Sequence, residues 1–372
     1  MPHGRIYSAG VPVAGGGGGS TVLYGSGAPA PGLGSVGDSY FDTSGHDVYK
    51  KTAVAIWTYE TSYLPNQGPF YGYFSGGYRN GFAVAEVITD RLDFRNDSAA
   101  MVTKGSLNTG TIGAAGFNSS TYGYVAGGQD AAGLGLATVE KLDFANDAAL
   151  MTNPGATLTA TRKNTVAANS TTLGYIAGGI DGIGSGMNST DGLVFATDAN
   201  PCLVKGVLVG ARAHQGSANS SLFAYFSGGV QGAIKQAGTS RLDFANDALA
   251  MVAKGALGAA TTALAGYNSA TFGYFSGGTD AGITANTWAL SFAADAVAMV
   301  AKGALSTART DSPGAANSSA KGYVAGGNLN GALLFSAICD ALDFSNDAAA
   351  MLAKGSLTAA REQLAGYQSG GI

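Results

Sequence analysis

The chain has 372 residues, of which 59 are glycine and only 12% are charged. An average globular protein is about one-quarter charged, and so much glycine without a Gly-X-Y period excludes collagen and favours short strands joined by tight turns. Hydrophobic residues reach 46%, which is enough for a large core and argues against disorder. The net charge of −4, without a run of Lys or Arg, predicts no nucleic-acid partner, because phosphate neutralisation needs a basic surface.

The sequence also predicts no export signal, no membrane span and no disulfide. The first ten residues, MPHGRIYSAG, lack the basic start and apolar stretch of a signal peptide. No uninterrupted apolar segment of about 18 residues occurs elsewhere. Cys202 and Cys339 lie in different repeats at non-equivalent positions, so we expect two buried free thiols and not a disulfide framework or a metal motif.

The N-terminal part shares nothing with the rest of the chain. Residues 1–20 are predicted to be a flexible arm ending in a Gly-rich linker, and residues 21–66 a small β module. Two short strands are expected around a turn at Thr43 to Asp47: Gly-Asp-Ser-Tyr-Phe-Asp (37–42) precedes it, and Val-Tyr-Lys-Lys (48–51) and Trp57 follow it.

This pattern resembles a small module of bacteriophage tail fibres. A lone hairpin of that size is marginally stable in water, so the resemblance implies attachment and self-association, as a trimer, through residues 21–66. The alternative is a simple hairpin that caps the following domain.

From residue 67 onward, an aromatic or aliphatic pair, a small residue and Gly-Gly recur six times. The second glycines are Gly77, Gly128, Gly179, Gly229, Gly278 and Gly327, which gives a period of 49 to 51 residues. A four-stranded propeller blade has this period. In the first uninterrupted copy we predict strands at 114–118, 122–126, 137–144 and 148–152, with turns between them.

The two ends of the repeat region each hold part of one blade. Residues 366–369 (GYQS) align with 116–119 (GFNS) in a first strand, whereas 72–77, 84–94 and 99–104 supply the other three strands of a blade. We therefore predict an all-β fold for residues 67–372: a six-bladed β-propeller of four-stranded blades, closed by the C-terminal strand joining the first blade. Such closure removes the exposed sheet edges that an open stack of blades would have.

From about residue 68 the repeat resembles kelch. Its strand ending in Gly-Gly is followed by an alternating strand ending near Asp and then by Leu-x-x-x-Arg, at Leu158…Arg162, Leu208…Arg212, Leu305…Arg309 and Leu357…Arg361. It departs from kelch at the outer strand, where Met101, Met151, Met251, Met299 and Met351 stand near the expected Trp. Because Met fills irregular gaps, we expect looser packing between blades.

Repeated aspartates are predicted to be structural. Leu-Asp-Phe and, shortly after it, Asn-Asp recur in most repeats, for example at 142–144 and 146–147. A catalytic residue would be expected in one copy, whereas every copy needs the same hairpin. We therefore predict that these aspartates close their hairpins by side-chain-to-backbone hydrogen bonds.

The sequence offers little chemistry for an enzyme. Its three histidines, His3, His46 and His214, are too scattered for a copper site, and no nucleophile elbow, zinc or phosphate-loop motif occurs. We therefore expect no enzyme activity, no cofactor and no metal. A carboxylate-only polysaccharide depolymerase remains an alternative, with Asp130, Asp181 and Asp280 as its candidate acids.

Length variation concentrates in one loop per repeat. The separation from the second glycine to the Leu position of the next strand is 12 to 15 residues, whereas the rest of each period is 36 or 37. All six loops should open on one face, and binding residues commonly stand on such loops. The predicted ligand-binding residues are Tyr78, Arg79, Asn80, Gln129, Asp130, Asp181, Gln231, Lys235, Asp280, Thr284, Asn328 and Asn330.

Together these features predict a phage tail-fibre or receptor-binding protein, made in the host cytoplasm and carried on the virion. Its N-terminal segment would attach to other tail or baseplate proteins, and the loop face would bind a host-surface glycan or protein. Neutral polar loops suit carbohydrate. The alternative is a purely structural virion component, such as a baseplate or fibre scaffold.

Overall fold

A computed structural model describes residues 22–42, 47–62, 70–79, 85–311, 313–331 and 334–370. The chain divides into two compact units, Met1–Gln67 and Gly68–Ile372. The described residues form strands and short 3-10 helices, so the predicted all-β class is confirmed. None of their helices is long and apolar enough to cross a membrane. The predicted arm at 1–20 and most of the turn at 43–47 lie outside the described residues.

The first unit holds a four-stranded sheet, not the predicted two-stranded hairpin. Its strands, in spatial order, are β1 (Val22–Gly25), β2 (Ser39–Asp42), β3 (Asp47–Ala53) and β4 (Ile56–Ser62). Strand β1 runs parallel to β2, and the other pairs are antiparallel. The ammonium of Lys51 is buried and donates to the carbonyls of Pro31, Leu33 and Gly34. This cation ties the Gly- and Pro-rich connection between β1 and β2 to the sheet.

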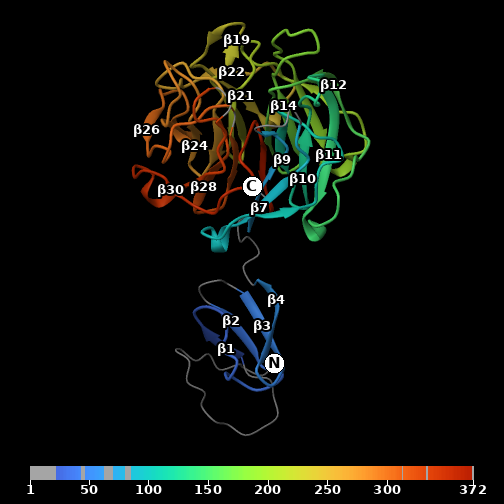
Figure 1. Ribbon diagram of the computed structural model, residues 1–372, viewed down its shortest axis with the longest axis vertical. Helices are drawn as coiled ribbons and strands as arrows, with labels where there is room; N and C mark the ends of the chain where they lie inside the picture. Colours follow the sequence, from blue (N-terminus) through green and yellow to red (C-terminus); the bar gives the residue numbers. More distant parts are fainter. Residues whose placement is uncertain are drawn as a thin grey trace. The chain divides into compact units, whose positions relative to one another are not determined.

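The described residues of the second unit form six four-stranded antiparallel sheets, one per repeat, and the fold is β-propeller-like (Figure 1). Sheets 1 to 6, each from first to fourth strand, are β32 (Ala365–Gln368), β5 (Tyr71–Ser75), β7 (Thr89–Asp93) and β8 (Val102–Lys104); β9 (Ala115–Asn118), β10 (Tyr122–Ala126), β11 (Leu136–Asp143) and β12 (Thr157–Arg162); β13 (Val166–Asn169), β14 (Leu173–Ala177), β15 (Thr190–Val194) and β16 (Leu203–Lys205); β17 (Gly216–Asn219), β18 (Phe223–Ser227), β21 (Thr239–Asp243) and β22 (Val252–Lys254); β23 (Ala265–Asn268), β24 (Phe272–Ser276), β25 (Thr287–Ser291) and β26 (Val300–Lys302); and β27 (Gly314–Asn317), β28 (Lys321–Ala325), β29 (Cys339–Asp343) and β30 (Leu352–Ala353).

Shorter elements join these strands. Two ribbons pair β6 (Tyr78–Arg79) with β31 (Arg361–Glu362) and β19 (Val230–Gln231) with β20 (Ile234–Lys235). A 3-10 helix follows each third strand: η1 (Phe94–Asn96), η2 (Phe144–Asn146), η3 (Phe195–Thr197), η4 (Phe244–Asn246), η5 (Phe292–Ala294) and η6 (Phe344–Asn346). Strand β32 pairs with β5, with Tyr367 opposite Tyr73.

The fourth strand of sheet 2 differs from the prediction. Residues 148–152 form no strand, and only Thr152 bridges to Lys141; the fourth strand is β12. Residues 148–151 lie in the turn after η2, as the corresponding residues do in the other sheets. Pro154, which lacks an N–H, stands where β8 has Lys104, so no strand continues beyond Thr152. In the other five sheets, the fourth strand begins directly after a buried Met or, at Cys202, a buried free thiol. Cys339 is also a buried free thiol, so both cysteine predictions are confirmed.

Each sheet packs against the next through a tyrosine of its second strand. These tyrosines are almost fully buried. Each ring stacks on the Phe of the next sheet's Leu-Asp-Phe position, with centroids 4.7 to 5.4 Å apart. Each hydroxyl donates to the aspartate that follows the next sheet's 3-10 helix. The six bonds, 2.8 to 3.1 Å long, are Tyr73–Asp147, Tyr124–Asp198, Tyr175–Asp247, Tyr225–Asp295, Tyr274–Asp347 and Tyr323–Asp97.

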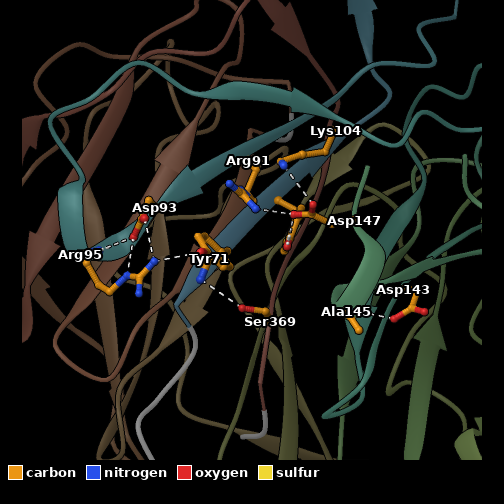
Figure 2. A network of polar contacts seen from close by, with 10 residues as sticks. Tyr71, Arg91, Asp93, Arg95, Lys104, Asp143, Ala145, Asp147 and Ser369 are labelled. Carbon is orange, nitrogen blue, oxygen red and sulfur yellow. Dashed lines mark hydrogen bonds and ion pairs between the residues drawn. The ribbon is translucent and has the colours of Figure 1, made fainter. Parts of the chain in front are cut away.

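We call this Phe and Asp pair the tyrosine socket. Its aspartate also receives cations from the tyrosine's own sheet: Arg91 and Lys104 lie 2.7 and 3.0 Å from the Asp147 carboxylate (Figure 2). The prediction that both sets of repeated aspartates close their own hairpins is therefore half wrong. Asp143 does so, accepting from the Ala145 N–H at 2.9 Å, whereas the side chain of Asp147 binds the neighbouring sheet.

The socket predicts that Asp147 contributes much more to the free energy of unfolding than Asp143, four residues before it. Asp147→Ala leaves the Tyr73 hydroxyl and two cations without their acceptor in a largely buried place, so it should lower the free energy of unfolding by about 2–4 kcal/mol. Asp143→Ala, which removes an exposed 3-10 cap, should cost about 0.5–1 kcal/mol. Urea unfolding of both variants measures this, and equal losses would contradict the socket's role.

Candidate functional site

The predicted loops all leave their sheets at the Gly-Gly pairs, where backbone conformation and space both require glycine. Gly127 and Gly128 have φ of 68° and 90°. A Cβ on Gly128 would lie 2.0 Å from the Thr111 Oγ1 and 3.0 Å from the Ile112 carbonyl oxygen. The loop therefore starts packed against residues 111–112, which lead into the first strand of the same sheet.

The three aspartates proposed as depolymerase acids close their own loops. The Asp130 Oδ1 accepts from the N–H groups of Ala132 and Leu134, both at 2.9 Å. Asp181 does the same for Ile183 and Ser185, at 3.0 and 2.8 Å. Asp280 accepts from the Gly282 N–H at 3.3 Å. All these bonds stay within one loop, so each carboxylate closes its own turn.

Other predicted residues also stabilise loops. Thr284 accepts from the Asn286 N–H at 3.1 Å, and Asn330 from the Leu334 N–H at 3.2 Å. The Lys235 ammonium donates to the Asp280 carbonyl and links two neighbouring loops. Gln129 pairs through its backbone with Ile112 and Gly135, and Gln231 is exposed in β19. Asn80 lies outside the described residues.

Three predicted residues, Tyr78, Arg79 and Asn328, meet where sheet 6 adjoins sheet 1. The Tyr78 ring packs edge-on against Phe335, with centroids 5.4 Å apart. Arg79 pairs with Glu86 at 2.7 Å, and the Asn328 amide donates to Glu362 at 2.9 Å. We call this region, with the β6–β31 ribbon, the seam.

The seam contains a carboxyl pair that sequence reasoning missed. Glu362 is 7% exposed, and burial followed by the neighbouring Asp311 carboxyl raises its pKa to about 7. Burial also raises the pKa of Asp311, whose carboxyl hydrogen-bonds Glu362. The pair can share one proton at neutral pH. The corresponding residues of other repeats include Ile112, Ala213 and Thr262, so the repeat pattern gave no signal for an acid here.

A small hollow lies between the first strands, at the end nearest the Gly-Gly loops. Its volume is about 70 Å³, and its lining includes Asn164, Thr165, Gln215 and Gln363. The Gln215 amide is buried without a hydrogen-bond partner among the described residues. A volume of this size holds about two waters, whereas ligand pockets usually exceed about 300 Å³. The hollow is therefore too small for a sugar.

A second hollow of about 50 Å³ lies at the other end of the first strands. Its lining includes the amides of Asn118, Asn169, Asn219, Asn268, Asn317 and Gln368.

His214 directly precedes Gln215 of the first hollow's lining. Burial lowers the pKa of His214 to about 4, so its imidazole is neutral at physiological pH. Among the described residues, no group of three His, Cys, Asp or Glu is placed to hold a metal ion.

Comparison with known proteins identifies the fold alone. No protein family matches the sequence, and no curated protein matches it. Among solved structures, the chain is similar to YjhT, with a TM-score of 0.60 and 11% sequence identity over 78% of this chain and 98% of that one. This similarity supports a β-propeller-like fold for the second unit.

The carboxyl pair predicts a stability that falls as pH rises. The folded protein holds the Glu362 proton up to a pKa of about 7, whereas an unfolded Glu releases it near pH 4.3. The contribution of Glu362 to stability is therefore greatest below that lower value. This contribution should decrease by about 3–4 kcal/mol between the two and then level off. Glu362→Gln should remove most of this slope and melt higher than wild type at pH 8. Parallel melting curves of the two proteins would contradict the shared proton.

Proposed function

We propose that the six sheets of the second unit form a closed, six-bladed, kelch-like propeller. Three observations support closure. Strand β32 completes sheet 1, the first strands contact one another in succession from β9 to β32 and back to β9, and a tyrosine socket joins sheet 6 to sheet 1 through Tyr323 and Asp97. The kelch relationship is supported by the Leu-x-x-x-Arg arginines, of which Arg162, Arg309 and Arg361 form fully buried ion pairs with Asp191, Asp340 and Asp90.

Closure predicts that the last strands are needed for a cooperative fold. Deleting Arg361 to Ile372 removes β31 and β32 and leaves Asp90 buried without its arginine, which costs several kcal/mol. The truncated protein should be insoluble or readily proteolysed. Deleting only 371–372 is the control and should leave the melting curve unchanged. A soluble form of the longer deletion that melts like wild type would rule out closure.

We further propose that the protein is a receptor-binding component of a phage tail fibre and not an enzyme. Residues 21–66 would attach it to the virion and form the trimer, and the Gly-Gly loop face would bind a host-surface receptor. The observation that carries this proposal is the loop face itself: loops of varied length and sequence on a repeated scaffold, of which those of sheets 2, 3 and 6 are closed by their own side chains. A binding role suits this face better than catalysis, because its candidate acids each close their own loop and the hollow beside it is small.

Binding to cells tests the proposal. Fluorescently labelled full-length protein should bind at least one strain in a panel of bacteria, in a saturable way that unlabelled protein competes. The purely structural alternative, a baseplate or fibre scaffold, predicts no binding to any strain. Absence of saturable binding across the panel would therefore favour that alternative.

A further inference from the structure

The tips of the Gly-Gly loops expose aliphatic side chains. Leu134, Ile183, Ile234 and Leu334, in the loops of sheets 2, 3, 4 and 6, are 65%, 89%, 70% and 51% exposed. In sheet 5 the corresponding side chain is Ile283, which is half-buried. Residues 80–84 of the loop of sheet 1 lie outside the described residues. One kind of side chain thus recurs at one end of five different sheets, although the loops differ in length and sequence.

Polar side chains hold these tips in place. The Asp130 Oδ1 accepts from the Leu134 N–H at 2.9 Å, and the Leu134 carbonyl in turn accepts from the Asp130 N–H at 3.0 Å. Asn330 binds the Leu334 N–H in the same way. These residues were predicted to contact a ligand, and in the structure they also fix the turns that present the aliphatic groups. Rigid presentation reduces the entropy lost on binding.

Neighbouring loops are also linked to one another. The Lys235 ammonium beside Ile234 donates to the carbonyl of Asp280 in the next loop. Ile283 of that loop lies against the loop of sheet 6, since a Cβ on Gly331 would be 3.8 Å from the Ile283 Cδ1. The loops of sheets 4, 5 and 6 therefore hold their tips in place relative to one another.

The chemistry of the tips distinguishes between possible ligands. Sugars are bound by aromatic faces and uncommitted polar groups, but the aromatic pair of the described loops, Tyr78 and Phe335, packs on itself, and the Asp and Asn side chains close turns. An anionic membrane would be repelled by the partly exposed carboxylates of Asp130, Asp181 and Asp280, which flank the tips. Exposed aliphatic groups with nearby acids fit a protein surface that has small apolar pockets and basic residues around them.

We propose that the loop face binds a protein receptor through Leu134, Ile183, Ile234 and Leu334, with partner Lys or Arg side chains opposite Asp130, Asp181 and Asp280. This inference rests on the proposed receptor-binding function and names the class of receptor. The four aliphatic side chains fill apolar pockets, and the carboxylates set the orientation.

A random-peptide display library, selected on immobilised full-length protein, tests the inference with two variants. The tip variant carries L134S, I183S, I234S and L334S. The control variant carries L150S, L222S, L249S and V297S, which change aliphatic residues of similar exposure, 57% to 66%, at the opposite ends of the strands. Circular dichroism and melting must match wild type for both.

Wild type and the control should enrich apolar peptides flanked by Lys or Arg, and the tip variant should bind the enriched peptides at least tenfold more weakly. Equal binding by the tip variant, or no apolar enrichment by wild type, would overturn the inference. So would tip-dependent binding to a glycan array, or to vesicles of phosphatidylcholine with phosphatidylglycerol, since either points to another class of ligand.

The same three proteins, applied to the bacterial panel, separate the two proposals. If all three bind cells equally, the receptor-binding function stands and the role of the tips is wrong. If wild type binds no strain, the receptor-binding function fails, whatever the peptides show. Loss of cell binding in the tip variant alone supports both.

Discussion

The second unit depends on one repeated interaction, the insertion of a buried tyrosine into the socket of the next sheet. A propeller-like fold has no continuous hydrogen-bonded sheet from one repeat to the next, so its sheets are joined by side chains and by short backbone contacts. Here the ring stacks on a Phe, the hydroxyl reaches an Asp, and Lys or Arg neutralises that Asp. A buried carboxylate alone would be costly, but with several donors it becomes a specific connection. The Tyr, the Phe and the Asp of this contact are present in all six repeats.

The socket also explains the Lys-Gly pair that follows the fourth strand's start. Lys104 binds the Asp147 carboxylate, and the next N–H, that of Gly105, donates to the Asp147 backbone carbonyl at 2.7 Å. A Cβ on Gly105 would lie 1.8 Å from the Ala149 carbonyl oxygen, so no other residue fits. Side chain and backbone of one aspartate thus meet two consecutive residues of the neighbouring sheet.

The sequence predicted the repeat, the all-β class and most strand positions, because period, Gly-Gly pairs and alternation are local signals. It failed where one local pattern allows two structures. Asp143 and Asp147 are both turn residues by type, yet only the fold shows that Asp147 faces another sheet. Asp130, predicted as a ligand residue because it is polar and in a loop, also closes that loop, a role that its residue type alone did not reveal. Glu362 was missed because its partners Asp311 and Asn328 are distant along the chain.

The position of β32 has a consequence for how the protein is made. Ser75 in β5 and Tyr367 in β32 are hydrogen-bonded across 292 residues of chain, so sheet 1 remains three-stranded on the ribosome until nearly everything after it has been translated. During that time the unpaired edge of β5 is open to strands of other nascent chains. Contacts this distant in sequence also form slowly. Chaperone dependence and sensitivity to translation rate should therefore concentrate in the earliest repeat, although it is the first to be synthesised.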